Sequence, residues 1–374
     1  MIKRVYVDNY KCMVNFEISL GDISLFLGQN GSGKSSVFQV LQMLVDFVGS
    51  AARVPALFRF DDRTRWQEQL VQSFEVDVAI PAGLCKYELA IEHLERSREG
   101  HKARVKHERL WLDNEPLLRF EGGDVQLYRD DHSEGPKYPF DWSQSAVASI
   151  LPRHDNRHLT RFKEALRRTE IVQVIPSLML AESGEEEERP SPRLENYASW
   201  YRHLSQDQGM AFQLTRTLQE TLAGFRHFKF EQAGEQHRIL KVCFSGGGER
   251  GLAEYSLAEL SDGQRMLIAL YTLLFASCSG NECKYTLCLD EPENFIALPE
   301  IQPWLVRLYD RCSAGEVQAL LISHHPELIN YLAAEAGFWF DHEPNMPARL
   351  TRITENDHSG LPISELVARG WLNG

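Results

Sequence analysis

A short glycine-rich segment has the residue types and the spacing that bind phosphate groups. Gly28–Ser35 has the sequence GQNGSGKS and fits the pattern GxxxxGK(S/T). Backbone N–H groups of such a loop curl around a β-phosphate, and the following helix adds the partial positive charge of its N-terminus. In this pattern the Lys34 ammonium reaches β- and γ-phosphate oxygens, and the Ser35 hydroxyl is a ligand of Mg²⁺. The segment predicts that the chain binds a nucleoside triphosphate, ATP, together with Mg²⁺.

The elements expected on both sides of this loop place it correctly. Ile23–Leu27 is an apolar run that predicts a strand leading into the loop. Val37–Val48 predicts an amphipathic helix directly after it. The nucleotide contacts expected from the loop and the start of the helix are Asn30, Gly31, Ser32, Gly33, Lys34, Ser35 and Ser36.

A second acidic segment lies far downstream. Thr286–Leu289 is an apolar run that predicts a strand, and Asp290 and Glu291 follow it directly. This is the Walker B arrangement, in which a strand presents two carboxylates beside the phosphate loop. We expect Asp290 to hold Mg²⁺ through water. We expect Glu291 to orient and polarise the attacking water as a general base.

The segment before another expected helix resembles a known motif. Leu260–Arg265, with the sequence LSDGQR, is similar to the signature LSGGQ of ABC-type ATPases, with Asp262 in place of the first glycine. ATPases of the RecF and SMC class commonly vary at this place. In that class the signature of one subunit binds the γ-phosphate held by the other, which implies that Ser261, Gly263 and Gln264 are ligands in trans. Ser261 is also suited to be the N-cap of the helix.

Two further elements of the same class have counterparts here. Leu321–Pro326, with the sequence LISHHP, resembles the switch-histidine element and aligns His324 with the residue that contacts the γ-phosphate and the water; His325 is the alternative. The class also has a glutamine that reaches Mg²⁺ and the water. Gln144, after the expected antiparallel strands, is the favoured candidate, and Gln72 competes with it.

The order of these motifs covers most of the chain. Phosphate loop, glutamine, signature, Walker B and switch histidine span Gly28 to His325, and the absence of a long heptad run excludes a coiled-coil arm. The chain resembles the compact ATPase heads of the RecF and SMC class. Its segments DEPENFIALPEIQPWL and ISELVARGW are similar to predicted bacterial AAA-type ATPases of anti-phage defence operons.

The resemblance implies an α/β fold, a P-loop NTPase of the ABC-ATPase head type. We expect a mixed or parallel core sheet with helices, an antiparallel β subdomain and a helical insertion. Residues 1–374 would form a single head with two lobes. Residues 1–180 hold the loop and an antiparallel sheet, 181–225 a surface loop and helical insertion, and 226–374 the signature, Walker B and switch histidine.

Bulk properties restrict the possible partners. The net charge of −13 argues against a broad surface that coats nucleic acid, because such binding depends on Lys and Arg. Seven scattered cysteines without a CxxC pair favour reduced thiols over a metal site. No apolar run approaches the roughly 20 residues that cross a bilayer, and the beginning of the chain lacks the apolar core of a signal peptide. We expect a cytoplasmic protein without a membrane partner.

Several functions agree with these motifs. The first is an ATP-driven switch in which two copies of the chain close around two ATP molecules and control a partner effector, plausibly a nuclease; no nuclease domain fits in the 50 residues after His324. The alternatives are a RecF-like repair ATPase that binds DNA directly, a non-catalytic nucleotide-dependent subunit and, more weakly, a transporter head. The basic segments that could contact DNA contain Arg96, Arg98, Lys102, Arg104, Lys106 and Arg109, and Arg153, Arg157, Arg161, Lys163, Arg167 and Arg168.

Overall fold

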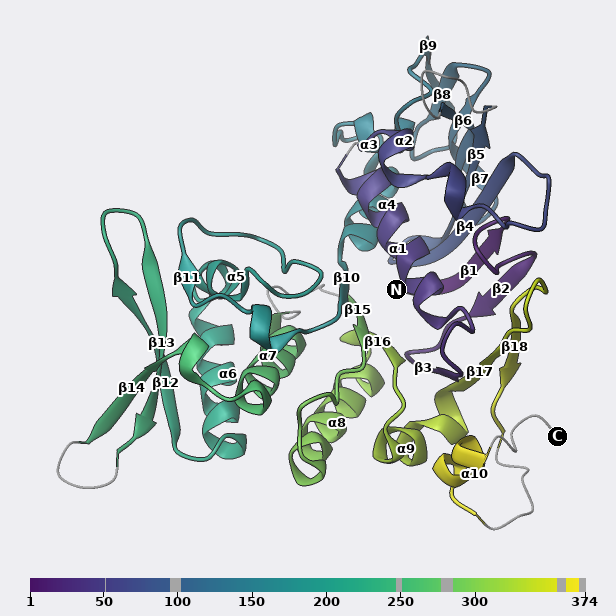
Figure 1. The fold of residues 1–374 in the computed structure, drawn as a ribbon. Coiled ribbons are helices and arrows are strands. Elements are labelled where there is room, and N and C mark those ends of the chain that lie inside the picture. Colours follow the sequence, from purple (N-terminus) through teal and green to yellow (C-terminus); the bar gives the residue numbers. More distant parts are fainter. Residues whose placement is uncertain (51, 95–101, 247–250, 277–284, 355–360, 370–374) are drawn as a thin grey trace. The chain divides into compact units, whose positions relative to one another are not determined.

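The computed structural model describes the chain except for residues 51, 95–101, 247–250, 277–284, 355–360 and 370–374. The chain divides into two compact units (Figure 1). Unit 1 contains Met1–Thr169 and Glu335–Asp357, and unit 2 contains Glu170–Ala334 and His358–Trp371.

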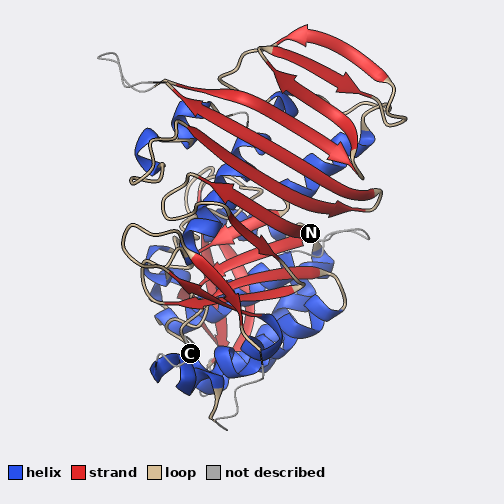
Figure 2. Ribbon diagram, turned by 90° about the vertical axis from the view of Figure 1, so that its right-hand side faces the viewer, coloured by secondary structure: helices blue, strands red, loops and turns tan. Residues whose placement is uncertain are grey.

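Unit 1 is built around an eight-stranded antiparallel sheet. Its strands alternate buried and more exposed residues, as Phe74, Val76, Val78 and Ile80 illustrate, so one face of the sheet packs on helices. Figure 2 shows the long strands side by side with these helices behind them. In spatial order the strands are β2 (Phe16–Ser19), β1 (Ile2–Asp8), β4 (Val71–Ile80), β5 (Gly83–His93), β6 (Ala103–Leu112), β7 (Glu115–Glu121), β8 (Asp124–Tyr128) and β9 (Glu134–Pro139).

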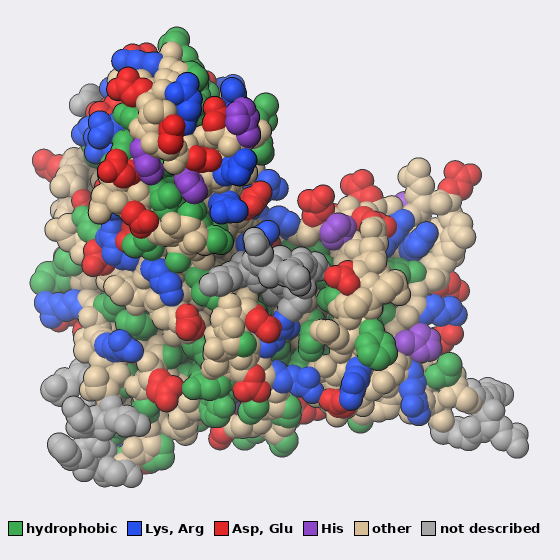
Figure 3. All heavy atoms as spheres, turned by 180° about the vertical axis from the view of Figure 1, so that it is seen from behind, with side chains coloured by type: hydrophobic (Ala, Val, Ile, Leu, Met, Phe, Trp, Pro, Cys, Tyr) green, Lys and Arg blue, Asp and Glu red, His purple; other side chains and the backbone are tan. Residues whose placement is uncertain are grey.

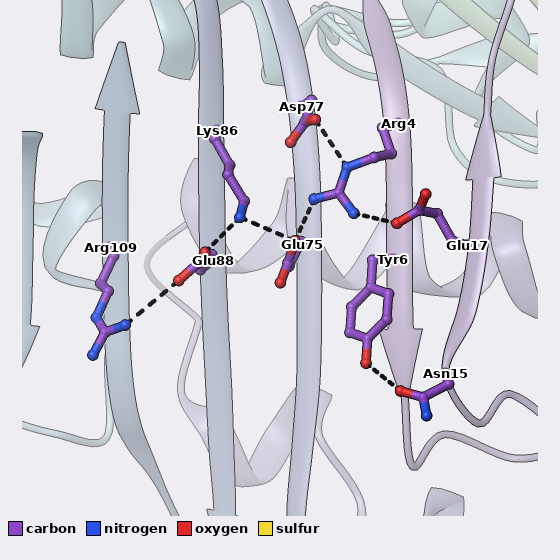
Figure 4. A network of polar contacts seen from close by, with 9 residues as sticks. All are labelled: Arg4, Tyr6, Asn15, Glu17, Glu75, Asp77, Lys86, Glu88 and Arg109. Atoms are coloured by element: carbon purple, nitrogen blue, oxygen red, sulfur yellow. Dashed lines mark hydrogen bonds and ion pairs between the residues drawn. The ribbon is translucent and has the colours of Figure 1, made fainter. Parts of the chain in front are cut away.

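The other face of this sheet carries a network of alternating charges (Figure 4). Arg4 contacts Glu17 at 2.7 Å and Asp77 at 2.9 Å and also pairs with Glu75. Lys86 on β5 contacts Glu75 on β4 at 3.4 Å, which extends the network to the next strand. Each such pair contributes about 0–1 kcal/mol at an exposed site, so the network mainly neutralises this face.

Three further strands of unit 1 present the phosphate loop. β3 (Ile23–Gly28) pairs in parallel with β17 (Gly337–Asp341), which pairs antiparallel with β18 (Arg349–Arg352). β3 is apolar and almost wholly buried, as a strand covered on both faces must be. The helices of unit 1 are α1 (Lys34–Gly49), α2 (Val54–Leu57), η1 (Phe60–Asp62), α3 (Ala146–Ser149) and α4 (Arg157–Arg167).

Unit 2 contains three largely buried strands in the order β10 (Thr169–Val172), β15 (Tyr285–Asp290), β16 (Val317–Ile322). β15 and β16 run in parallel register, with Asp290 opposite Ile322. Its helices are η2 (Pro176–Leu178), α5 (Tyr197–Leu204), α6 (Gln208–Thr221), η3 (Leu257–Glu259), α7 (Asp262–Ala276), α8 (Leu298–Ser313), α9 (Pro326–Ala336) and α10 (Ile363–Arg369).

A four-stranded sheet completes unit 2. β13 (Arg238–Ser245) lies between β12 (Phe225–Gln232) on one side and β11 (Glu182–Ser183) and β14 (Leu252–Ser256) on the other. The charged segment 181–193 is held in place, because β11 pairs with β13 and Arg189 donates both guanidinium bonds to Glu170 at 2.9 Å. Gly247 and Gly248, between β13 and β14, lie outside the described residues.

The described residues also bear on membrane spans, on the state of the cysteines and on metal sites. Within the described residues, none of the helices combines the length and the apolar character that a membrane span requires. Five cysteines in the same part of the chain are free and buried, and Cys278 and Cys283 lie outside it. The described residues contain no cluster of three or more His, Cys, Asp or Glu side chains suited to a metal ion.

Candidate nucleotide site

The phosphate loop connects β3 to α1 in unit 1. Gly28, Gly31 and Gly33 have φ angles of 142°, 82° and 105°, a region that favours glycine. A Cβ atom on Gly28 would collide with the carbonyl oxygen of Phe340 on β17. The turn therefore requires glycine, and α1 begins with its N-terminal N–H groups directly behind the loop.

Lys34 is the first residue of α1, and its side chain folds back into the loop. Its ammonium donates to the carbonyl oxygens of Gly28, at 2.7 Å, and Gln29, at 2.9 Å, and only 6% of the residue is exposed. Ser32 is buried too, and its Oγ atom has no hydrogen-bond partner among the described atoms. A buried cation and an unpaired hydroxyl within one loop fit a phosphate ligand, which would satisfy both.

The remaining residues expected to contact phosphate also lie at this place. Asn30, Gly31 and Ser35 are exposed, and Ser36 is half-buried in the first turn of α1. A Cβ atom on Gly31 would meet nothing within 4 Å, so the space in front of the loop is open. Mg²⁺ commonly keeps several waters and binds one or two protein oxygens besides phosphates, so a hydroxyl such as that of Ser35 fits it.

Both candidate glutamines belong to unit 1, in different environments. Gln72 on β4 is fully buried; its Nε2 donates to the Asn9 carbonyl at 3.0 Å, and its Oε1 lies 2.7 Å from His93 Nε2. Gln144 is half-buried in the turn before α3. These contacts make Gln72 part of the sheet's interior, and they favour Gln144, whose role stays a prediction.

A buried carboxylate orders the segment that follows Gln144. Glu108 on β6 is fully buried and accepts hydrogen bonds from Ser145 Oγ and the Ala146 N–H, both at 2.6 Å, and from Tyr87 at 2.8 Å. Burial raises the pKa of Glu108, and these bonds oppose the shift by stabilising the charge. The start of α3, directly after Gln144, is thereby fixed to the sheet.

The signature segment of unit 2 forms the start of α7. Ser261 and Gln264 cap the helix reciprocally: Ser261 Oγ accepts from the Gln264 N–H at 3.3 Å, and Gln264 Oε1 accepts from the Ser261 N–H at 3.1 Å. Asp262, the departure from the signature pattern, pairs with Arg265 at 2.8 Å. A Cβ atom on Gly263 would lie 2.8 Å from the Phe295 carbonyl oxygen, so this glycine permits close packing against the turn after Walker B. Ser261 is both exposed and an N-cap.

The Walker B strand β15 ends in a strained turn. Asp290 is its last residue, and Glu291 follows with a φ of 52°, which is rare for a residue other than glycine. The Glu291 N–H donates to the Ile322 carbonyl at 2.8 Å, and its carboxylate accepts from Asn294 Nδ2 at 2.8 Å. Strain held by such bonds is typical of functional sites. Both carboxylates are half-buried.

The switch segment lies beside this turn, after β16. His324 is exposed, and its main-chain N–H donates to Glu293 Oε1 at 3.3 Å. His325 differs, because its Nδ1 accepts the Glu327 N–H at 3.2 Å and so caps the start of α9. The ring of His325 therefore has a structural role at the start of α9. The assignment of His324 to the nucleotide stays a prediction.

The candidate residues are divided between the units. Lys34 and Gln144 belong to unit 1, and Ser261, Glu291 and His324 belong to unit 2, where the hydrogen bonds given above join the Walker B turn to the switch segment. The roles of these residues stay predictions.

Comparison with known proteins identifies the family. Residues 23–330 match the family described as "AAA domain, putative AbiEii toxin, Type IV TA system". The chain belongs to this AbiEii-type AAA family. No curated protein matches the sequence.

Solved structures show the fold of this AbiEii-type AAA protein. The SMC head bound to the C-winged helix domain of ScpA matches with a TM-score of 0.55 and 11% identity, covering 95% of this chain and 98% of that one. An SMC head with an extended coiled coil, bound to the C-terminal domain of ScpA derived from Pyrococcus furiosus, matches with a TM-score of 0.50 and 11% identity, covering 100% and 99%. The predicted fold, the P-loop fold of such SMC heads, is confirmed.

Sequence reasoning missed the residues that support the site. Glu108 and Glu293 both bind segments at least 30 residues away in the sequence. The separation is 37 residues for Glu108 and Ser145, and 30 and 31 residues for Glu293 with Ser323 and His324. An acidic residue at an otherwise buried strand position was the one available signal for Glu108. No signal in the sequence connects Glu293 with the switch segment.

Proposed function

We propose that this protein is an ATP-hydrolysing switch whose two copies close around two ATP molecules. Lys34 and the loop amides bind the phosphates, Asp290 and Ser35 hold Mg²⁺, and Glu291 takes a proton from the attacking water. Bound Mg²⁺ neutralises charge on the β- and γ-phosphates. His324 and Gln144 contact the water or the γ-phosphate. The observation that carries this proposal is the strained Glu291 turn at the end of β15, in a chain that also has an intact phosphate loop.

The exposed signature supports the two-chain arrangement. Ser261 is exposed and the first residues of α7, Asp262 and Gly263, are half-buried, so a second copy can reach Ser261. A helix N-terminus binds anions well, and a phosphate held by another subunit is such an anion.

Mixed dimers test this arrangement. Lys34→Ala loses phosphate binding, and Ser261→Arg blocks the signature, so each variant alone should be inactive. Their mixture should recover about a quarter of wild-type turnover per chain, because half of randomly paired dimers contain one intact composite site. Phosphate release is the measurement. No recovery, although differently tagged chains co-purify, would contradict a site shared between two chains.

The partner and the biological role follow from the same proposal. Closing and opening of the dimer controls a separate effector, plausibly a nuclease, in bacterial anti-phage defence. The family description refers to a putative toxin of a type IV toxin–antitoxin system, and the solved SMC heads are bound to a partner protein, ScpA. Co-purification of the Glu291→Gln protein with the products of neighbouring genes, with and without ATP, tests the effector.

A second candidate function is direct DNA binding, and one surface favours it. Arg157 and Arg161 on α4 and Arg168 at its C-cap are exposed, and among the described residues their guanidinium groups make no ion pair; only the main-chain N–H of Arg157 donates to an acidic side chain, that of Asp130, at 2.9 Å. The other basic segment is largely neutralised, since Arg104 pairs with Glu92 at 2.7 Å and Arg109 with Glu88 and Glu121; its Arg96 and Arg98 lie outside the described residues. On the face drawn in Figure 3, basic and acidic side chains are intermingled.

Charge reversal on α4 separates the two candidates. Changing Arg157, Arg161 and Arg168 to Glu should leave ATP turnover unchanged and reduce any DNA binding, lowering the slope of log K against log salt by about 3. The matched control changes Lys102 and Arg104, and DNA binding is titrated across a salt series. Tight wild-type binding that α4 reversal removes would support the DNA-binding function. If the protein binds no DNA, even as Glu291→Gln with ATP, the partner-controlling switch is the better account.

A further inference from the structure

Glu293, two residues after the proposed general base, has a buried carboxyl group with an unusual set of contacts. Only 6% of the residue is exposed. Its Oε1 accepts a hydrogen bond from Ser323 Oγ at 2.7 Å and from the His324 N–H at 3.3 Å. Both donors belong to the switch segment after β16, so this one oxygen connects the Walker B turn to the backbone of the switch histidine.

The connection continues beyond these two donors. Ser323 is fully buried, and its Oγ accepts the His325 N–H at 3.0 Å while it donates to Glu293. On the other side of the turn, the Glu291 N–H donates to the Ile322 carbonyl at 2.8 Å. The Walker B turn is thus joined at two points to the residues that immediately precede His324.

The environment of Glu293 indicates which kind of side-chain group this connection requires. Burial raises the pKa of the Glu293 carboxyl group, and its Oε2 atom is buried without a hydrogen-bond partner among the described atoms. An unpaired polar atom in the interior is unfavourable, so a purely structural link would be better served by another side chain. The two hydrogen bonds at Oε1 require an acceptor at that position, but they do not require it to carry a negative charge.

We propose that Glu293 is a positioning residue for ATP hydrolysis, which holds the backbone of Ser323 and His324 in register with the Glu291 turn. This inference rests on the proposed function of the site. Glu293 itself does not touch the nucleotide or the water. It acts by fixing the main-chain position from which the His324 side chain extends. This position matters because a displacement of about 1 Å at a reacting group can reduce a rate by 10²-fold.

Two substitutions at one position test the proposal. In Glu293→Ala the acceptor is lost, and we expect kcat to fall about 10²-fold while the Kd for ATP stays within about twofold, since no phosphate ligand is altered. In Glu293→Gln the amide oxygen can accept from Ser323 and His324, and most of the activity should return. Glu300→Ala is the matched control, because Glu300 is an exposed acidic residue at the start of α8. Turnover and nucleotide affinity are measured for all three.

A second readout is independent of activity. Amide hydrogen exchange of a peptide spanning β16 and the switch segment should increase in Glu293→Ala and remain at the wild-type rate in Glu293→Gln and Glu300→Ala. If the wild type hydrolyses no ATP, the proposed function fails, and exchange still decides whether Glu293 fixes the segment. The proposal is overturned by unchanged kcat in Glu293→Ala, by a Gln variant as inactive as the Ala variant, by equal loss of affinity and kcat, or by unchanged exchange.

Discussion

Replacement of Lys34 by alanine is expected to abolish nucleotide binding. The ammonium is buried in the loop and bound to the carbonyl oxygens of Gly28 and Gln29, so it already occupies the cradle that a β-phosphate would enter. A charge-assisted hydrogen bond contributes about 1.5–3 kcal/mol, and loss of two of them should weaken the Kd for ATP by about 10²-fold or more. A titration with a fluorescent ATP analogue measures this effect.

The matched control for this variant is Lys3→Ala. Lys3 lies on β1 in the same unit, is half-buried, and makes one long ion pair with Asp22 at 3.8 Å. Its removal should leave the affinity unchanged. Wild-type affinity in Lys34→Ala would show that the loop does not bind phosphate as proposed.

Replacement of Glu291 by glutamine should separate binding from hydrolysis. The amide keeps the shape of the side chain and can still accept the bond from Asn294. It cannot take a proton from water, and removal of a general base typically reduces a rate by about 10²–10⁴-fold. We therefore expect turnover to fall by this factor while the Kd for ATP is preserved, as measured by phosphate release and by nucleotide titration.

Two comparisons make this second result decisive. Glu300→Gln changes an exposed acidic residue nine positions later and should retain wild-type turnover. Turnover that persists in Glu291→Gln would contradict the assignment of Glu291 as the base. Loss of ATP affinity in parallel with turnover would instead point to a damaged turn.

The local elements of the fold could be predicted because each is specified by a short run of sequence. Apolar runs predicted β3 and β15, since the full burial of a strand leaves a clear pattern. The phosphate loop was recognisable because its glycines are required by backbone geometry, as the positive φ of Gly28 and Gly33 illustrates. These features depend on few distant contacts.

The features that could not be predicted depend on contacts between distant residues. The return of the chain at β17, which pairs with β3 more than 300 residues away, leaves no local pattern. The choice between Gln72 and Gln144 needed the contacts of Gln72 with Asn9 and His93. Segment 181–193 has the charge and proline content of a solvated loop, yet β11 and the Arg189–Glu170 pair hold it to the rest of unit 2.

The candidate site shows the same division. Walker B and the signature were recognisable from residue types in a fixed order, whereas the reciprocal cap of Ser261 and Gln264 could be expected only in part, from the preference of serine for the N-cap position. The positive φ of Glu291 is determined by its bond to Ile322, which a sequence cannot show.

The most direct test of the account is the mass of the Glu291→Gln protein in solution. One chain has a mass of 42.9 kDa. Light scattering after size-exclusion chromatography should give a single chain without nucleotide and twice that mass with Mg²⁺ and ATP, because bound ATP that is not hydrolysed keeps two copies closed. Adding Ser261→Arg to the same chain should return the mass to that of one chain with ATP still bound. A Glu291→Gln protein that binds ATP and remains a single chain would contradict the ATP-driven switch.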